Sequence, residues 1–196
     1  MFKKITLALM LITFTSTVHA GQNFEELFFS ELKSETFETL NAVNLSKGEK
    51  VARLSTILTE NLAILQVGRS VLGQPWRKIN KDEKREYIRA FSKWIGVTIA
   101  ERLVSMDIKQ DLVIQKVYKG QNSIVVVRTV TENVVAGGDV VLDWYIRTIK
   151  GEPKLIDVAV SNVSMVATQR SEILSIYGNK GLKGVIDQMT LQVNTQ

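Results

Sequence analysis

The chain has 196 residues, of which 45% are hydrophobic and 23% are charged, proportions typical of a globular domain with a substantial core. It contains no cysteine, which excludes disulfides and every site built on thiolate ligands. Lysine and arginine number 25 against 20 aspartate and glutamate. This mild positive balance suits contact with anionic membrane surfaces, but it is also common in proteins that have no such partner.

The first twenty residues have the layout of a secretory signal peptide. Two lysines precede an apolar run from Ile5 to Val18, and Val18-His19-Ala20 has the small residues of a cleavage site. The run is too short to span a bilayer comfortably. We therefore expect residues 1–20 to be removed and residues 21–196 to form a single domain outside the cytoplasm.

Cleavage would also remove His19, the only histidine of the chain. A mature chain without histidine or cysteine cannot build Ser-His-Asp or Cys-His triads, nor zinc or copper sites with imidazole or thiolate ligands. Nucleotide-binding glycine loops and calcium-loop spacing do not occur, and the basic residues are not interleaved with aromatic ones. We expect no catalytic residues, no metal, no cofactor and no nucleic-acid partner.

Helical periodicity dominates the first half of the chain. A first helix is predicted over about 23–42, a second over 50–65, and one or two helical turns end near Gly73, before Pro75. Their expected apolar stripes are Phe24, Leu27, Phe28, Leu32, Phe37 and Leu40 in the first helix, and Val51, Leu54, Ile57 or Leu58, and Leu62 in the second.

The longest helix is predicted from Asn80 to about Met106. Asn80 is a candidate N-cap, and Glu83 lies three residues further on, as in a capping box. An apolar stripe follows, while most basic residues lie off it; its members are Tyr87, Phe91, Trp94, Ile95, Ile99 and Leu103.

Four antiparallel strands are predicted between Asp111 and Val160, at about 112–118, 123–132, 140–147 and 155–160. Short turns separate them at 119–122, 136–139 and 150–153, which favours a meander. The third strand alternates strictly, with Val140, Leu142, Trp144 and Ile146 on its apolar face, and the fourth continues with Ile156, Val158 and Val160. In the second strand the pattern is ambiguous. Arg128 lies either in a central strand or near a strand end, where it reaches solvent.

A helix is predicted from Thr168 to Tyr177, ending at Gly178 or Asn179, and a last short helix contains Leu182 to Met189. Because one face of the sheet is apolar, helices must cover it. The pattern therefore predicts an α+β fold with an antiparallel four-stranded sheet covered by helices, and it allows an apolar cavity between them.

Three segments carry motifs of one known family. They are Val71-Leu72-Gly73-Gln74-Pro75-Trp76-Arg77 with the helix start from Asn80 to Phe91, then Val163 to Glu172, then Gly181 to Ile186. In this order, over about residues 65–189, they resemble the MlaC or toluene-tolerance auxiliary family of periplasmic lipid carriers. Pro75 and the absence of a Thr-Pro helix start depart from the family pattern, and they affect helix geometry more than ligand chemistry.

The resemblance implies a periplasmic carrier with a cone-like fold similar to nuclear transport factor 2. Its acyl tails would lie in the apolar cavity, and its cargo would be a phospholipid passed between an inner-membrane lipid ABC transporter complex and an outer-membrane lipoprotein–porin complex. We expect a monomer. Two tails of roughly 30 methylenes at ~0.8 kcal/mol each cost on the order of 20 kcal/mol to expose to water. Such a carrier must therefore keep the tails dry, which requires no catalytic residue.

We predict that the pocket is lined from both sides, with its mouth or hinge at the family motifs. The predicted lining is Leu142, Trp144 and Ile146 from the sheet and Phe91, Ile95 and Ile99 from the long helix; the mouth or hinge is Val71, Leu72, Trp76, Val163 and Met165. For each of these residues, plain core packing is the alternative interpretation, because core and pocket linings have the same composition.

Three other functions fit the same pattern. The cargo can be a hopanoid or another apolar ligand, since apolar linings do not distinguish a flat polycycle from two tails. A small-molecule enzyme on a similar fold would need polar residues inside the cavity, and Arg128 is the one visible candidate. The third is a non-catalytic envelope interaction domain with no cavity.

Overall fold

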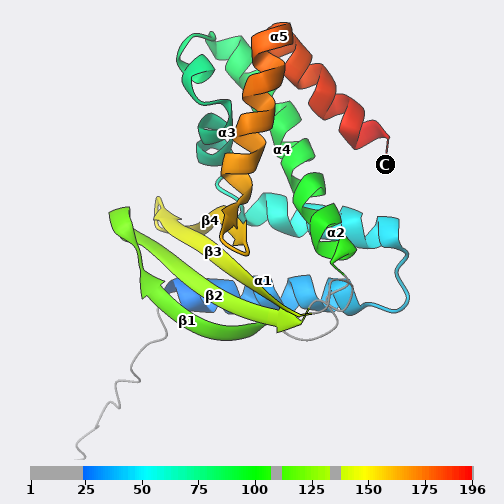
Figure 1. The fold of residues 1–196 in the computed structure, drawn as a ribbon, viewed down its shortest axis with the longest axis vertical. Coiled ribbons are helices and arrows are strands. Elements are labelled where there is room, and N and C mark those ends of the chain that lie inside the picture. Colours follow the sequence, from blue (N-terminus) through cyan, green and yellow to red (C-terminus); the bar gives the residue numbers. More distant parts are fainter. Residues whose placement is uncertain (1–23, 107–111, 133–137, 196) are drawn as a thin grey trace, which may run out of the picture.

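The computed structural model describes residues 24–106, 112–132 and 138–195. The expected signal peptide lies outside these ranges, as do residues 136 and 137 of an expected turn. In Figure 1 the sheet and the first helix form a lower layer, and the remaining helices stand above it. Within the described ranges, every helix is too short or too polar to cross a membrane.

The order of elements confirms the expected helices followed by a sheet. The elements are α1 (Phe24–Asn41), α2 (Lys47–Asn61), α3 (Ile64–Leu72), η1 (Gln74–Arg77), α4 (Lys81–Ser105), β1 (Val113–Lys119), η2 (Gln121–Ser123), β2 (Ile124–Glu132), β3 (Asp139–Ile149), β4 (Glu152–Val160), β5 (Val163–Ser164) and α5 (Met165–Asn194). The capping box that begins α4 is present, because Asn80 accepts from the backbone N–H of Glu83 and Glu83 accepts from that of Asn80.

The sheet is antiparallel throughout, in the order β1-β2-β3-β4-β5, so the expected meander is confirmed with one strand more. The fifth strand exists because Ser161 and Asn162 adopt positive φ values of 49° and 66°. Two such residues make a tight hairpin turn, which pairs Val163 with Val160. Lys150 and Gly151 make the same kind of turn between β3 and β4, with φ values of 53° and 88°.

The apolar face of the sheet follows the predicted alternation except at one β-bulge. Trp144 lies opposite Val127 and Val158, as a period of two requires. The register then shifts, so that Leu155 lies opposite Ile146 and Ile156 is the extra residue. The prediction that Leu155 lies on the other face from the core was therefore wrong, since Leu155 is fully buried, whereas Ile156 packs partly buried against the core as predicted.

Helix α1 covers this face with part of the predicted stripe, since Leu32 is buried and Phe28 and Leu40 pack against the core. Its buried residues are Phe29, Leu32, Thr36 and Thr39, whereas Phe24 and Leu27 are 54% and 47% exposed. The α1 sequence holds two overlapping apolar stripes. The ring of Trp144 lies 5.4 Å from that of Phe29, and this contact selects the second stripe. In α2 the expected Leu54 and Leu58 are buried.

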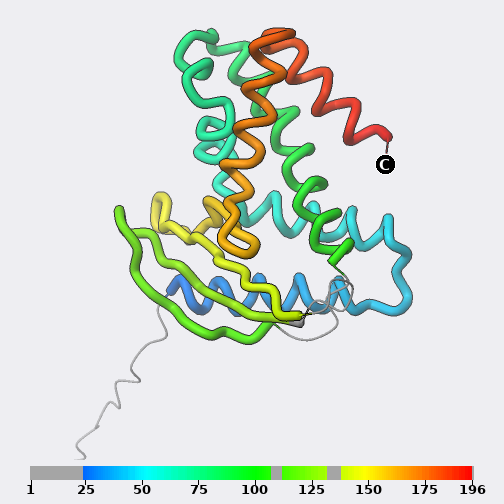
Figure 2. The backbone as a smooth tube through the Cα atoms, in the orientation of Figure 1, coloured from blue at the N-terminus to red at the C-terminus, as the bar shows by residue number. Residues whose placement is uncertain are grey.

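Helices α3, α4 and α5, with η1, form what we call the helical lobe, and α2 runs beneath α4 (Figure 1). Figure 2 shows the sharp turn in the path of α5, which occurs at Gly181 with φ 64°. Helix α5 therefore begins earlier than the predicted Thr168. The predicted break between two helices is confirmed, but it lies at Gly181 rather than at Gly178 or Asn179. The N-cap Ser164 explains the early start, because its hydroxyl accepts from the backbone N–H of Ala167, and the carboxylate of Asp157 accepts in addition from that of Val166.

We expect Gly96→Ala to lower the free energy of unfolding by about 1 to 2 kcal/mol, net of the ~1 kcal/mol that alanine adds to helix propensity. The physical reason is that α2 and α4 touch at Gly96, where a Cβ atom would lie 2.9 Å from the carbonyl oxygen of Ser55. Urea unfolding followed by circular dichroism measures the change.

Gly178→Ala is the matched control, because its Cβ atom would meet nothing within 4 Å. This control should raise the free energy of unfolding by about 0.5 to 1 kcal/mol. A Gly96→Ala protein as stable as Gly178→Ala would contradict the close contact of the two helices.

Candidate functional site

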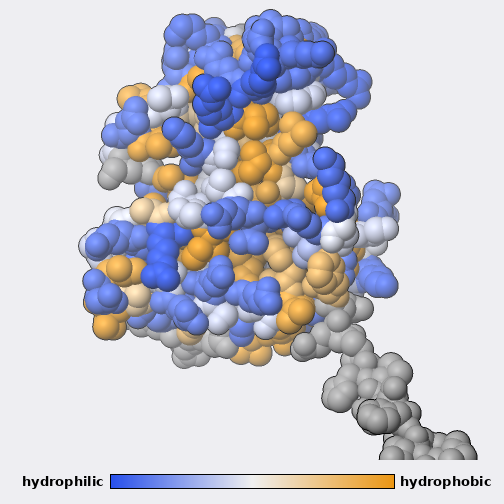
Figure 3. All heavy atoms as spheres, turned by 180° about the vertical axis from the view of Figure 1, so that it is seen from behind, coloured by the Kyte–Doolittle hydropathy of each residue, from blue (hydrophilic) through white to orange (hydrophobic). Residues whose placement is uncertain are grey.

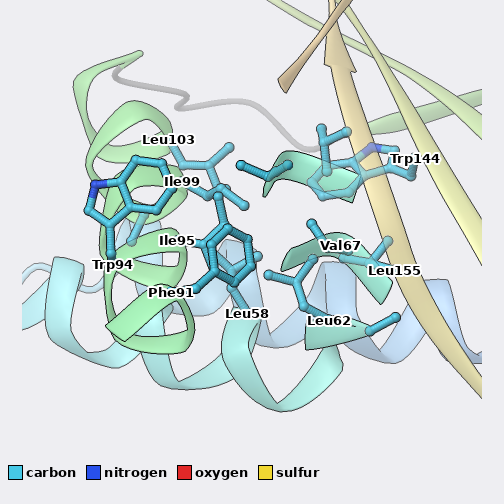
Figure 4. Packing of buried hydrophobic residues seen from close by; sticks show 14 of the residues in the cluster. Leu58, Leu62, Val67, Phe91, Trp94, Ile95, Ile99, Leu103, Trp144 and Leu155 are labelled. Carbon is cyan, nitrogen blue, oxygen red and sulfur yellow. The ribbon is translucent and has the colours of Figure 1, made fainter. Parts of the chain in front are cut away.

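Buried apolar side chains from the sheet and from helices α1 to α4 form one continuous cluster, which we call the apolar interlayer. Its members include Phe29, Leu32, Leu58, Leu62, Val67, Val71, Leu72, Phe91, Ile95, Ile99, Leu103, Leu142, Trp144, Ile146, Leu155 and Val158. Figure 4 shows Phe91, Ile95, Ile99 and Leu103 of α4 on one side of it and Leu155 and Trp144 of the sheet on the other, with Val67 of α3 between them. The interlayer therefore has two walls, one made by the lobe and one by the sheet.

The structure brings most of the predicted lining residues into this interlayer. Leu142, Trp144 and Ile146 come from β3, Phe91, Ile95 and Ile99 from α4, and Val71 and Leu72 from α3. All eight are at most 7% exposed, so the interlayer is closed to solvent at these positions. The predicted mouth residues are dispersed: Trp76 packs against the outside of the cluster, Met165 is buried apart from it, and Val163 is 58% exposed.

Several interlayer residues were not predicted as lining. They are Phe29 and Leu32 of α1, Leu58 and Leu62 at the end of α2, Val67 of α3, Leu103 of α4 and Leu155 of β4. Helical periodicity marked Leu32, Leu58, Leu62 and Leu103 as apolar-face residues. Periodicity could not show which layer each helix would cover, because that choice depends on contacts between residues that are distant in sequence.

The polar groups beside the interlayer are uncharged, and their hydrogen bonds stay within one wall. The indole Nε1–H of Trp144 donates to Oγ1 of Thr129 on the adjacent strand, at 3.0 Å. In the lobe, the hydroxyl of Tyr87 donates to the carbonyl of Gly68, also at 3.0 Å, and burial raises the pKa of Tyr87 well above its ordinary value. Such a lining suits an apolar ligand.

Arg128 and Asp143 lie together on the opposite face of the sheet. They are paired in register at mid-strand, and the guanidinium donates to both carboxylate oxygens at 2.7 and 2.6 Å. Asp143 raises the pKa of Arg128 through this bonding, and Asp143 itself is 3% exposed. The ambiguity of the second strand is thereby resolved: Arg128 lies mid-strand and faces away from the interlayer, which removes the one candidate for a polar residue in the cavity.

Asp157 joins the sheet to the first turn of α5. Its Oδ1 accepts from the backbone N–H groups of Val158 and Val166, at 2.8 and 3.1 Å, and its Oδ2 accepts from the hydroxyl of Ser164. Burial is the largest influence on this carboxyl and raises its pKa, and the hydrogen bonds oppose that effect. The start of α5 is thus fastened to β4.

A cleft of about 610 Å³ lies on the lobe and not in the interlayer. We call it the basic cleft; it is lined by Leu65, Trp76, Lys81, Lys84, Arg85, Ile88 and Arg89. Three further clefts along α2, α4 and α5, of about 290, 520 and 380 Å³, contain none of the predicted lining residues. The amine of Lys84 lies 5.5 Å from the ring centre of Trp76, so the expectation that basic residues lie apart from aromatic ones was wrong here.

The described part of the chain shows no cluster of metal-ligating side chains. Among these residues, no three His, Asp or Glu side chains are grouped so that they could hold a metal ion.

Comparisons with known proteins bear directly on this architecture. The family model of the MlaC protein matches residues 30–190. The chain belongs to the MlaC family. The resemblance stated from the motifs is therefore confirmed. No curated protein matches the chain.

A solved structure also resembles this MlaC-family fold. It is the phospholipid-binding protein from Ralstonia solanacearum, in complex with a phospholipid, with a TM-score of 0.71 and 14% sequence identity. The match covers 87% of this chain and 97% of the other. At this identity the likeness establishes the fold, and it confirms the helix-covered antiparallel sheet.

We expect the stability that Asp157 contributes to decrease as pH rises. Its pKa is raised in the folded protein, so its favourable contribution is complete below the unfolded-state pKa and is lost as pH rises through the folded-state value. The free energy of unfolding of the natural protein, minus that of Asp157→Asn, should therefore fall as pH rises above the ordinary aspartate pKa of about 3.9. Urea titrations at each pH measure this difference.

Asp187→Asn provides the matched removal of a carboxyl group from an exposed site on α5. The prediction fails if the natural protein gains stability relative to Asp157→Asn as pH rises.

Proposed function

We propose that this protein is a periplasmic phospholipid carrier that holds acyl chains in the apolar interlayer. It would receive lipid at one membrane complex and release it at another, between an inner-membrane lipid ABC transporter and an outer-membrane lipoprotein–porin complex. The observation that carries the proposal is the interlayer itself, a charge-free apolar zone between two separately bonded walls. Membership of the MlaC family and the phospholipid bound by the Ralstonia protein support it.

An apolar interlayer supplies what such cargo requires. Two acyl tails of roughly 30 methylenes cost on the order of 20 kcal/mol to expose to water, at ~0.8 kcal/mol each. Contact with side chains such as Phe91, Ile99 and Trp144 would replace contact with the bilayer interior. No proton transfer or covalent step is needed, which agrees with an interlayer that lacks ionisable groups other than the bonded phenol of Tyr87.

The walls must separate to admit the tails, because the interlayer is closed to solvent in this structure. The hydrogen bonds of Trp144 and Tyr87 each stay within one wall, so separation need not break either of them. Apart from the hydrogen bonds that β4 makes with Glu60, Ala63 and Val166, what joins the walls is apolar contact, and packed helices can slide over such a surface in small steps. The tails then replace contacts that the two walls make with each other.

The phosphate headgroup needs no dedicated pocket, because it can remain in water at the edge of the interlayer. We therefore propose no catalytic residue, no metal and no cofactor other than the lipid cargo. The glycerol end of the phospholipid would lie where its tails enter the interlayer.

We expect protein purified without detergent from the periplasm to carry one phospholipid, detected by native mass spectrometry. Ile99→Trp should lower the occupied fraction by about tenfold or more, because an indole takes volume that a tail would fill. Ile99 is 7% exposed and lies on the α4 wall.

Arg102→Trp, which places the same indole on an exposed position of the same helix, is the control and should carry lipid normally. Circular dichroism establishes that both variants fold; should Ile99→Trp not fold, Leu103→Phe makes the same test with a smaller side chain. Natural protein that carries no lipid, or a folded interlayer variant that carries as much as the control, would refute the proposal.

A further inference from the structure

The basic cleft is formed where the short helices α3 and η1 meet the first turns of α4. Lys81, Lys84, Arg85, Ile88 and Arg89 are spaced by three and four residues, so they share one face of α4. This face continues further along α4 into the buried positions Ile99 and Leu103, so the cleft is set apart by its place at the exposed N-terminal end of α4. None of the residues that line the cleft is a buried member of the interlayer, although Trp76 and Ile88 pack against its outer edge.

The floor of the basic cleft is apolar and partly exposed. Leu65 is 54% exposed, and Trp76 and Ile88 are half-buried beside it. The ring of Trp76 packs edge-on against Tyr87, 6.3 Å between centroids, and Lys84 lies over its face. Trp76 is thus held in place by α4 before any ligand arrives. A fixed and partly exposed aromatic ring within an apolar patch is a common anchor in protein interfaces.

Cations surround this floor, and few of their charges are neutralised. Asp82 pairs with Arg85. Lys81 and Arg89 form no ion pair within the described chain, and Lys84 rests on Trp76. Figure 3 shows hydrophobic residues reaching the surface of the lobe between hydrophilic ones. The chemistry complementary to such a surface is an apolar side chain flanked by carboxylates.

The exposure of the apolar lining distinguishes among the possible occupants. Insertion into a bilayer requires several apolar groups that project together beyond the charges, whereas here Leu65 is exposed but Trp76 and Ile88 are half-buried among the cations. Two copies of this chain that met through the cleft would place like charges together. A free anion would make no use of an apolar floor. A helix with one apolar ridge between acidic residues would place its ridge on the apolar lining of the cleft and its carboxylates beside the cations.

We propose that the basic cleft is a docking site for an acidic amphipathic helix of a partner protein. An apolar side chain of that helix seats on Trp76 and Ile88, and its aspartate or glutamate residues face Lys81 and Arg89. The inference does not rest on lipid carriage, because no interlayer residue forms the cleft.

The test uses a fluorescently labelled synthetic peptide of about 14 residues, long enough for four helical turns, with leucines along one face and glutamates on both sides of them. Binding to the full mature chain is measured by anisotropy at about 50 mM NaCl, where screening is modest. Tryptophan emission reports contact, because Trp94 and Trp144 are 3% and 2% exposed and Trp76 is the accessible indole. The peptide should bind and change this emission.

Charge reversal provides the decisive comparison. The double variant Lys81→Glu, Arg89→Glu should bind the peptide about tenfold or more weakly, and Ile88→Ser should weaken binding without changing charge. The control is the double variant Lys47→Glu, Arg53→Glu, which makes the same change of net charge on another helix. Lys47 is the first residue of α2, and Arg53 lies in the interior of that helix. The control should alter affinity by less than about twofold.

Each alternative outcome overturns the proposal. No binding of the peptide at 1 mM, about the weakest affinity of interest, means that the cleft is not a helix dock. Equal weakening by the control means that only net charge matters. If phosphatidylglycerol vesicles or inorganic phosphate change Trp76 emission and the peptide does not, the cleft contacts membrane or simple anions. Self-association that the cleft variants abolish identifies a second copy as the partner. Native mass spectrometry of the same variants reports lipid separately.

Discussion

The burial of Trp144 is the interaction on which the arrangement of sheet and helices depends. Val127 and Val158 flank its indole on the neighbouring strands, and Phe29 meets it from α1. A buried indole needs a partner for its N–H, and Thr129 provides one inside the sheet. The whole ring can therefore be buried without a bond to the lobe. Around Trp144 the sheet wall is therefore complete in itself, and the lobe is held against this part of it by apolar contact.

The parts of the fold that follow from local pattern were predictable. The alternation around Trp144 identified its strand and its buried face, and the stripe from Tyr87 to Leu103 identified α4 and its buried side. The capping box at Asn80 fixed the start of α4 to one residue. In each case a single pattern extends over many residues, so neighbouring signals support one another.

The parts that failed depend on contacts between distant segments. Which of two stripes α1 buries is decided by the position of Trp144, more than a hundred residues later. The bulge at Ile156 and the turn at Ser161 and Asn162 involve single residues, too few to register as periodicity. The basic cleft was missed for the same reason, because Trp76 comes to lie under Lys84 only when η1 folds back onto α4. The candidate site was predicted best where strand and helix stripes converge, and worst at Val163, whose family motif carried no information about burial.

The polar ties between the two walls show how an apolar interlayer can open without loss of the fold. The backbone N–H of Ala63 donates to the carbonyl of Leu155 at 2.8 Å, and Lys154 donates to the carbonyl of Glu60 at 3.1 Å. The third tie is the carboxylate of Asp157, which accepts from Val166 at the start of α5.

All three ties lie on β4, over four consecutive residues, and the side of the interlayer toward β2 is held by apolar packing. Apolar contacts have no fixed direction, so they can be exchanged for contacts with a ligand, whereas a hydrogen bond broken in a buried site leaves an unpaired group. A rotation of the lobe about β4 would therefore be the least costly opening motion. It would expose Trp144 and the α4 wall while α2, α3 and α5 remain attached to the sheet.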